Sequence, residues 1–455
     1  MPDDPQLLPA STDATPISWR IAAAGMLGVG LLGGERATGA GARRATLTAS
    51  GLGFVLWTII VGASRRAARL DPAAAGCPAP APDAGLLPRV DVVIPARDEA
   101  RALPALLRDL GAQDHRDPDG CPKFTVTVID DRSTDRTSRV AAAAADRAGL
   151  GTCFRVVSRS LGARPDGKGA ALAAIPASLL CGAAIVVLDA DARLEPDFLR
   201  RAAAWVAVGT PALTARRRVR HADAGLLAAA QAAEQTLDGY QLRARAAVGG
   251  YGELRGNGMV VTPSALHAAG GWPAGSLTED LDLATRLAVR GIPVAWAADL
   301  VVWEAPTATF AALGRQRLRW AEGSLRRFLA LVPAVLASGS LTVVAKVDLI
   351  GYAVQLVLPP FFAGMAIGGI RRRRPVVPLV LGGVYIGVAG GLTWVALGEE
   401  ATFDGRPMPA RARLTRSMLG GSFAAHWLAV VPLALARIAI RTGPTTFERT
   451  RDRLL

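Results

Sequence analysis

Three short clusters near the middle of the chain combine residue types that handle cations, protons and phosphates. They are Asp189-Ala190-Asp191, Thr278-Glu279-Asp280 and Gln316-Arg317-Leu318-Arg319-Trp320. Two carboxylates on alternate residues can hold one hard divalent cation, which would also bind the oxygens of a substrate phosphate. A carboxylate of the second cluster can accept a proton. The third cluster combines an Arg that can bind phosphate with an aromatic ring that can stack on a sugar.

Each cluster also has a plainer interpretation. The first carboxylate pair could belong to a solvated turn. Thr278 could cap a helix whose positive end the two following carboxylates merely complement. The third cluster could be a basic amphipathic helix with Trp320 at a bilayer interface. The order and spacing of the three clusters, rather than any one of them, favour a catalytic set.

Two further segments place polar residues after an apolar run or in a glycine-flanked loop. In Asp130-Asp131-Arg132-Ser133-Thr134-Asp135, Asp131 can accept hydrogen bonds from a base or ribose, whereas Asp135 is suited to capping the next helix. The loop from Arg164 to Gly169 holds Lys168, one of three lysines in the chain. Lys168 can meet a diphosphate as a point charge, or the loop can be an exposed turn.

The elements that must position these residues begin at Arg89. Apolar runs predict strands over Val90–Pro95, Phe124–Ile129, Phe154–Val157 and Ala184–Leu188, with helices over Ala100–Leu110 and Thr134–Ala148. Alternation of strands and helices predicts an α/β domain with a mostly parallel sheet. Ligands bind beyond the carboxyl ends of such strands, so we expect the carboxylates after the second and fourth runs to share one crevice.

The flanking regions are apolar. Residues 1–70 contain a polar tail and one or two candidate transmembrane helices, Ile17–Gly34 and Thr46–Ala63, and residues 71–88 form a Pro/Ala-rich linker. A catalytic domain is predicted over 89–328. The region 329–455 completes an amphipathic, interfacial helix over Leu325–Leu336 and adds about three membrane segments and a basic tail. These segments are Val347–Ile370, Val376–Gly398 and Ser417–Ile440.

Charge and cysteine usage narrow the class of protein. The net charge of +14 comes almost entirely from Arg, and much of this Arg borders apolar segments, so we expect no nucleic-acid partner. The four Cys and four His are scattered without metal-ligand spacing. Arg65, Arg66 and Arg69 after the second apolar segment place the catalytic domain in the cytoplasm. The cluster Arg371–Arg374 conflicts with this orientation unless Pro359-Pro360 breaks its segment into a hairpin.

With these residues in place, the chain resembles the family 2 inverting glycosyltransferases. It is most similar to the membrane-embedded branch with cellulose and hyaluronan synthases and several lipid glycosyltransferases. The resemblance covers about Arg89 to Phe328. The motifs that carry it are, in chain order, Val93-Ile94-Pro95-Ala96-Arg97-Asp98-Glu99, Ile129 to Asp135, Gly167-Lys168-Gly169, Asp189-Ala190-Asp191, Gly256-Asn257-Gly258, Thr278-Glu279-Asp280, and Gln316 with Arg319-Trp320.

The resemblance implies a GT-A-type, Rossmann-like domain flanked by N- and C-terminal transmembrane helices, in a multi-pass protein of the cell membrane. It implies that Asp191, with Asp189, holds Mg²⁺ or Mn²⁺. Asp280, with Glu279 beside it, would be the catalytic base. The residues it assigns to binding the nucleotide-sugar and the acceptor are Pro95, Glu99, Asp131, Lys168, Asp189, Gln316, Arg319 and Trp320.

The sequence departs from the family pattern in three places. Arg97 stands where many members carry an aromatic residue, Arg132 replaces the commonest Gly, and a Phe-x-Val-Thr-x-Lys gating loop is missing before Gln316. We therefore expect transfer of a sugar, from a donor such as a UDP-hexose, with inversion to a lipid or lipid-linked acceptor at the bilayer. A processive polysaccharide synthase and a non-catalytic membrane subunit that keeps the fold are the alternatives.

Overall fold

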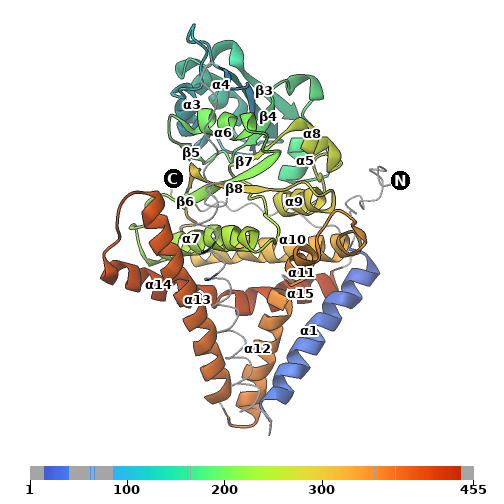
Figure 1. Ribbon diagram of the computed structural model, residues 1–455. Coiled ribbons are helices and arrows are strands. Elements are labelled where there is room, and N and C mark those ends of the chain that lie inside the picture. The colour runs from blue at the N-terminus through green and yellow to red at the C-terminus, as the bar shows by residue number, and fades with distance from the viewer. Residues whose placement is uncertain are drawn as a thin grey trace.

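The computed structural model of the protein describes residues 15–39, 62, 66, 86–160, 162–163, 165–351, 354–374 and 376–441. Figure 1 shows a sheet covered by helices above a set of long helices. The strands are β1 (Val90–Ala96), β2 (Phe124–Asp131), β3 (Phe154–Arg159), β4 (Ala184–Val187), β5 (Arg193–Leu194), β6 (Ala212–Val219), β7 (Met259–Val261) and β8 (Ala295–Glu304). The α-helices are α1 (Ile17–Ala37), α3 (Leu103–Gly111), α4 (Thr137–Arg147), α5 (Lys168–Ala173), α6 (Phe198–Ala207), α7 (Leu226–Ala247), α8 (Pro263–Ala268), α9 (Glu279–Val289), α10 (Phe310–Ala337), α11 (Val343–Gly351), α12 (Val354–Arg371), α13 (Val376–Phe403), α14 (Ala410–Ala424) and α15 (Trp427–Ile440), with 3₁₀ turns at Gly151–Cys153 and Ala177–Leu179.

The eight-stranded sheet has the order β3-β2-β1-β4-β7-β6-β8-β5. Parallel pairs join β1 to β2 and β4, β2 to β3, and β6 to β8. β7 runs antiparallel to β4 and β6, and β5 runs antiparallel to β8. The predicted mostly parallel sheet is confirmed. Because β1, β2 and β4 run in one direction, their carboxyl ends lie at the same edge.

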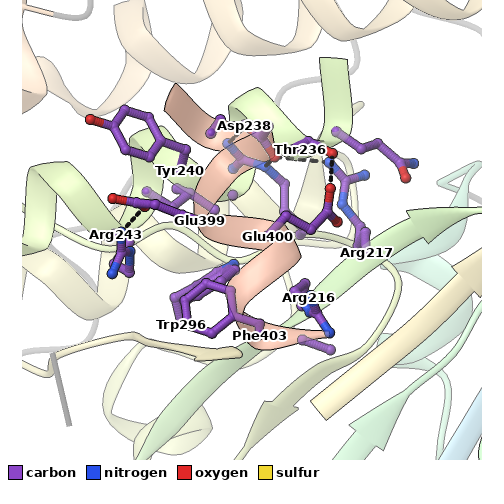
Figure 2. A pocket seen from close by; sticks show the side chains of 16 residues that line it. Arg216, Arg217, Thr236, Asp238, Tyr240, Arg243, Trp296, Glu399, Glu400 and Phe403 are labelled. Atoms are coloured by element: carbon purple, nitrogen blue, oxygen red, sulfur yellow. Dashed lines mark hydrogen bonds and ion pairs between the residues drawn. The ribbon is translucent and has the colours of Figure 1, made fainter. Parts of the chain in front are cut away.

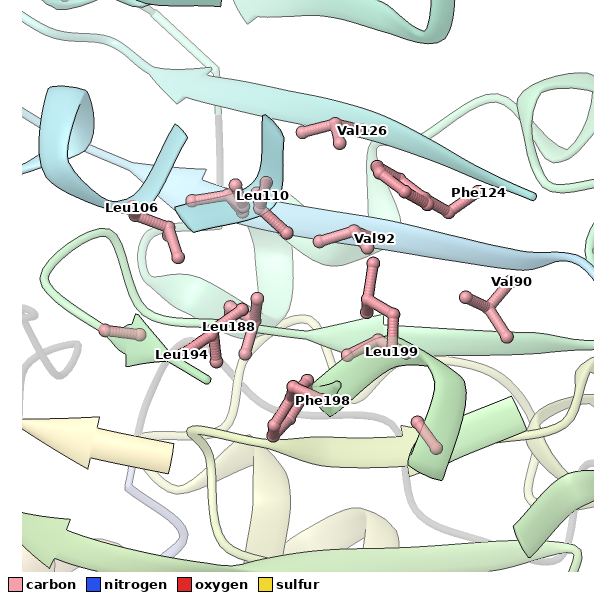
Figure 3. Close-up of a cluster of buried hydrophobic side chains, with 14 of the residues drawn as sticks. Val90, Val92, Leu106, Leu110, Phe124, Val126, Leu188, Leu194, Phe198 and Leu199 are labelled. Carbon is pink, nitrogen blue, oxygen red and sulfur yellow. The ribbon is translucent and has the colours of Figure 1, made fainter. Parts of the chain in front are cut away.

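Side chains alternate between the two faces of the strands, and each face of the sheet builds a core. Val92 of β1 packs on one face with Leu106 of α3 and Phe198 of α6 (Figure 3). Val93 points to the other face, where it belongs to a core with Leu283 of α9. All five side chains are buried, and burial of such a side chain contributes about 1.5–3 kcal/mol. Both cores therefore hold the strand ends, and the loops that follow them, in fixed positions.

Helix α10 connects the sheet domain to the apolar helices. The Oγ1 atom of Thr309 accepts the Ala312 N–H at 3.2 Å and caps the start of the helix. Further along, Leu325 is buried against α15. Because α10 is continuous to Ala337, the predicted amphipathic segment Leu325–Leu336 is the second half of the helix that carries Gln316.

Helices α1, α12 and α13 extend downward from the sheet domain in Figure 1, while α7, α10, α14 and α15 lie across their upper ends. α1 and α12 run side by side, and Arg371 Nη1 lies 3.0 Å from Glu35 Oε1 where both end. α12 is helical through Pro359 and Pro360, so the hairpin that these prolines allowed is not formed. Arg371 therefore lies at the end of α12 farthest from the sheet.

Among the residues that the structure describes, three helical stretches are long and apolar enough to cross a membrane: Ile17–Ala37, Pro378–Phe403 and Ala410–Ile440. They overlap three of the predicted membrane segments, and the last of them is divided into α14 and α15 by a turn at residues 425–426. The predicted segment Val347–Ile370 is shared between α11 and α12. Thr46–Ala63 lies almost wholly outside the described residues, as do most of the 71–88 linker and the tail beyond Arg441.

Candidate active site

The predicted site residues gather at the carboxyl edge of the parallel strands. Pro95 is the penultimate residue of β1, and Asp131 is the final residue of β2. Val93 pairs with Val187 at the end of β4, so Asp189 emerges close to the level of Pro95. The expectation that the two acidic segments open into the same crevice agrees with this register.

The loops after β1 and β2 are bound to each other. Asp98 Oδ1 accepts the backbone N–H of Thr134 at 2.6 Å, and the N–H of Glu99 donates to Thr137 Oγ1 at 2.8 Å. Asp135 Oδ1 accepts the N–H of Thr137, the first residue of α4, at 2.8 Å, while Arg136 occupies the N-cap position. These bonds hold the loops after β1 and β2 in fixed positions relative to each other.

Asp131 is buried and held by two guanidinium groups. Its Oδ1 atom lies 2.9 Å from Arg132 Nε and 2.6 Å from Arg159 Nη1. Arg132 and Arg97, two of the departures from the family pattern, both pair with Asp166 in the loop before Lys168. This shared partner ties the loops after β1 and β2 to the Lys168 loop, and sequence reasoning gave no sign of it.

A charged constellation lies around the start of α9. Lys168, the first residue of α5, places Nζ 2.6 Å from Asp189 Oδ1 and 3.6 Å from Glu279 Oε1. The same Nζ donates to the Gly256 carbonyl oxygen, and the Gly256 N–H donates to Asp280 Oδ2 at 2.7 Å. The backbone of Gly256 therefore binds both Asp280, the predicted base, and Lys168, the predicted diphosphate ligand.

Gly256 fits this place because it has no side chain. A Cβ atom there would lie 3.2 Å from Lys168 Nζ, 3.3 Å from Asp280 Oδ2 and 3.4 Å from Glu279 Oε1. Its neighbour Asn257 is buried, and its Oδ1 atom accepts the Asp189 N–H at 3.1 Å. The turn that contains Gly256 thus contacts both acidic clusters directly, which the sequence motif alone did not indicate.

Burial and neighbouring charges shift the ionisation of two groups in this constellation. Burial raises the pKa of Glu279 to about 7; Lys168 opposes this shift and Asp280 adds to it. Burial disfavours the ammonium of Lys168, but the carboxylates of Asp189 and Glu279 outweigh burial and raise its pKa. Lys168 therefore stays charged, and Glu279 can change its protonation near neutral pH.

The third cluster lies on α10, next to the start of α9. Gly323 packs against Thr278, the residue that precedes Glu279, and Arg319 is one turn earlier on the same helix. Gln316 is buried and accepts a hydrogen bond from Arg317 Nη1 at 3.1 Å. The guanidinium of Arg317 lies 4.1 Å from the centroid of the Trp320 ring, so one aromatic face is covered by Arg317.

The residue types after β4 suit a hard divalent cation. Asp189 and Asp191 supply carboxylate oxygens, and Asp191 is buried in the turn between β4 and β5. No group of three His, Cys, Asp or Glu that could hold a metal occurs among the residues that the structure describes. Asp189 and Asp191 are the residues that would hold such a cation.

Comparison with known proteins places the chain in a family. Residues 88–323 match the family described as glycosyltransferase-like family 2. The chain belongs to glycosyltransferase family 2. It is 31% identical over 371 residues to the beta-monoglucosyldiacylglycerol synthase of Synechocystis sp., covering 80% of this chain and 74% of the relative. The synthase of Trichormus variabilis is 30% identical, with 80% and 77% covered.

Solved structures support the fold. A mannosyltransferase from Pyrobaculum calidifontis, in complex with GDP-Man and Mn²⁺, aligns with a TM-score of 0.53 at 22% identity. The alignment covers 84% of this chain and 97% of that one. The predicted GT-A-type fold with flanking apolar helices is confirmed. The roles of the individual site residues stay predictions.

Proposed function

We propose that this glycosyltransferase moves one hexose from a UDP-sugar, with inversion, onto the hydroxyl of a diacylglycerol-type lipid. The observation that carries this proposal is the constellation of Lys168, Asp189 and Asp280 around Gly256. It lies at the strand ends beside α10, whose second half packs on the apolar helices (Figure 1). The similarity to monoglucosyldiacylglycerol synthases supports a lipid acceptor.

The donor would lie across the carboxyl edge of the sheet. Pro95, Glu99 and Asp131 would contact the nucleoside, since they line the joined loops after β1 and β2. Lys168 and Arg319 would bind the diphosphate oxygens. Gln316 would steady the Arg317 guanidinium, and the other face of the Trp320 ring would meet the acceptor.

Asp189 and Asp191 fit Mg²⁺ or Mn²⁺ and would hold it against the diphosphate. The cation would supply charge stabilisation to the departing nucleoside diphosphate. The Mn²⁺ ion in the complex of the Pyrobaculum calidifontis mannosyltransferase supports a divalent ion of this kind. Lys168, whose pKa is raised, adds a fixed positive charge on the same side.

Transfer would occur as one displacement. The acceptor hydroxyl oxygen forms a bond to the anomeric carbon while the bond from that carbon to the phosphate oxygen breaks. The hydroxyl proton passes to a carboxylate oxygen of Asp280, and nucleoside diphosphate leaves with the electron pair. The Gly256 N–H donates to Asp280 Oδ2 at 2.7 Å and the Leu281 N–H donates to Asp280 Oδ1 at 2.8 Å, so two backbone donors fix the carboxylate that would accept the proton. Attack opposite to the leaving group gives inversion.

We place the protein in the cell membrane as a multi-pass protein with the catalytic domain in the cytoplasm, where UDP-sugars are made. The helices Ile17–Ala37, Pro378–Phe403 and Ala410–Ile440 support membrane attachment. α10 and α15 would then lie close to the bilayer surface, which brings the constellation within reach of a lipid headgroup.

A donor panel tests this proposal. The detergent-purified chain is incubated with Mn²⁺, diacylglycerol and one of UDP-glucose, UDP-galactose, UDP-N-acetylglucosamine or GDP-mannose, and release of nucleoside diphosphate is measured. We expect release from one UDP-hexose that depends on diacylglycerol. Release without diacylglycerol, together with growth of a long polymer, would favour a processive synthase. No release from any donor would favour a non-catalytic subunit.

A further inference from the structure

A ring of buried and half-buried polar residues lies behind Gly256. It consists of Arg217 of β6, Asp238 of α7, Glu304 at the end of β8, and Arg255 and Asn257 on either side of Gly256; we call these five residues the polar ring. Arg217 closes it, because its Nη2 atom lies 3.0 Å from Asp238 Oδ2 and its Nη1 atom 3.7 Å from Glu304 Oε1. β6, α7 and β8 therefore meet at the Arg217 guanidinium, and the turn Arg255–Asn257 binds its two partners Asp238 and Glu304.

One branch of the polar ring leads to the predicted base. Asp238 binds Arg255 with two hydrogen bonds, at 2.9 Å to Nε and 2.6 Å to Nη2. Two parallel bonds of this kind fix the plane of a guanidinium as well as its position. Because Arg255 directly precedes Gly256, this fork sets the direction of the Gly256 N–H that binds Asp280.

The other branch leads to Asp189-Ala190-Asp191, the acidic cluster predicted to hold the metal. Glu304 Oε1 accepts Asn257 Nδ2 at 3.2 Å, and Asn257 Oδ1 in turn accepts the Asp189 N–H at 3.1 Å. Glu304 Oε2 also accepts Gln235 Nε2 at 2.6 Å. Both carboxylate oxygens of Glu304 thus accept hydrogen bonds from side-chain amides. The residue at this position must therefore accept on both of its terminal atoms, which a carboxylate does.

The opposite charges in the polar ring stabilise one another against the cost of burial. Asp238 and Glu304 outweigh the effect of burial and raise the pKa of Arg217, while Arg255 and Arg217 hold the pKa of Asp238 well below its usual range in spite of burial. Arg217 and Asp238 also line a small cavity, of about 30 Å³, against Glu399, Glu400 and Phe403 of α13 (Figure 2). The polar ring thus lies between the site and α13, and its Asn257 contacts the site through the Asp189 backbone.

We infer that Arg217 is a positioning residue for the transfer reaction. It holds Asp238 and Glu304 so that the turn Arg255–Asn257 presents Gly256 to Asp280 and Lys168, and the Asn257 amide to the Asp189 backbone. This inference rests on the proposed function, since it assigns Arg217 to the same site. Arg217 acts through its two branches, one toward the base and one toward the metal cluster.

The test separates the branches. Asp238→Asn should lower kcat about tenfold with the Mn²⁺ requirement unchanged, because a shift of about half an ångström in a reacting group corresponds to a loss of this size. Glu304→Gln places an amide nitrogen against Asn257 or Gln235, so it should weaken Mn²⁺ binding several-fold. Electron paramagnetic resonance with UDP and Mn²⁺ measures that binding without any turnover.

Substitutions of Arg217 should show both defects together. Arg217→Met should lower kcat about tenfold and weaken Mn²⁺ binding, and Arg217→Lys, which keeps the charge, should recover part of each loss. The matched control is Arg218→Met. Arg218 is the next residue of β6, but it pairs with Glu400 of α13 and with Asp404, which directly follows α13. This control should lose thermal stability and keep both kcat and Mn²⁺ binding.

Two results would overturn the inference. One is wild-type kcat and Mn²⁺ binding in both Arg217 variants while the wild-type chain is active. The other is equal effects of Asp238→Asn and Glu304→Gln on both quantities, which a merely structural role would produce. If the wild-type chain releases no nucleotide from any donor, the proposed function fails instead, and Mn²⁺ binding in the presence of UDP still reports on the Glu304 branch.

Discussion

Replacing Gly256 with alanine perturbs the centre of the site by the smallest possible change. The added methyl group would meet Lys168 Nζ at 3.2 Å, Asp280 Oδ2 at 3.3 Å and Glu279 Oε1 at 3.4 Å. All three atoms are ends of side chains and can retreat by a few tenths of an ångström. Gly256 does not have a left-handed backbone conformation, so alanine is accommodated without backbone strain. The fold is therefore expected to survive while the charged groups move.

The size of the effect follows from these distances. A displacement of 1 Å at a reacting group costs roughly a hundredfold in rate, so a retreat of a few tenths of an ångström costs about fivefold to tenfold. This corresponds to about 1–1.4 kcal/mol of transition-state stabilisation. We expect Gly256→Ala to lower kcat by that factor, with the thermal midpoint within a few degrees of the wild-type value.

The assay is release of nucleoside diphosphate at saturating donor, with thermal unfolding measured on the same preparation. Gly314→Ala is the matched control. Gly314 lies in α10 with nothing within 4 Å of a Cβ, so alanine should keep kcat and add about 1 kcal/mol of helix stability. Wild-type kcat in Gly256→Ala would refute the assignment of Lys168 and Asp280 to the reacting groups.

Three further outcomes are expected. Chelation of divalent metal by EDTA should reduce transfer to background, and Mn²⁺ or Mg²⁺ should restore it; full activity in EDTA would contradict the role of Asp189 and Asp191. Burial raises the pKa of Glu279 to about 7, so its contribution to stability is present below about pH 4.5 and is lost as pH rises through 7. The thermal midpoint of the wild-type chain should fall over this window more than that of Glu279→Gln, and parallel curves would contradict the shift. Asp404→Asn should lower stability by about 1–2 kcal/mol, because Asp404 accepts hydrogen bonds from Arg216 at 2.9 Å and Arg218 at 2.6 Å, while kcat stays within twofold; a larger loss of kcat would mean that the end of α13 acts on the reaction.

The parts of the fold that follow from local pattern could be predicted from the sequence. Val90–Pro95 and Ala184–Leu188 are almost uniformly apolar and became β1 and β4, which are buried on both faces. Because parallel strands share their carboxyl edge, the placement of Asp131 and Asp189 followed from the strands alone. The apolar run from Val376 likewise became α13.

The parts that depend on distant contacts could not be predicted. The Gly256 carbonyl and Lys168 are 88 residues apart, and no local pattern links them. Arg217 is one of three consecutive arginines on β6, and only the arrangement of β6, α7 and β8 distinguishes it from Arg216 and Arg218. The turn between α14 and α15 was missed for a similar reason, since the whole segment is apolar enough to be a single helix.

The central claim is that this chain attaches a sugar to a lipid with Asp280 as the base. The most direct measurement incubates membranes containing the wild-type chain or Asp280→Asn with radiolabelled UDP-glucose and UDP-galactose, and then separates the organic extract by thin-layer chromatography. Asp282→Asn, on the same helix and paired with Arg286, is the control and should behave as wild type at equal folded protein. We expect one labelled lipid carrying a single sugar, reduced at least about a hundredfold in Asp280→Asn. Equal labelling of lipid by Asp280→Asn, or label only in water-soluble polymer, would contradict the account.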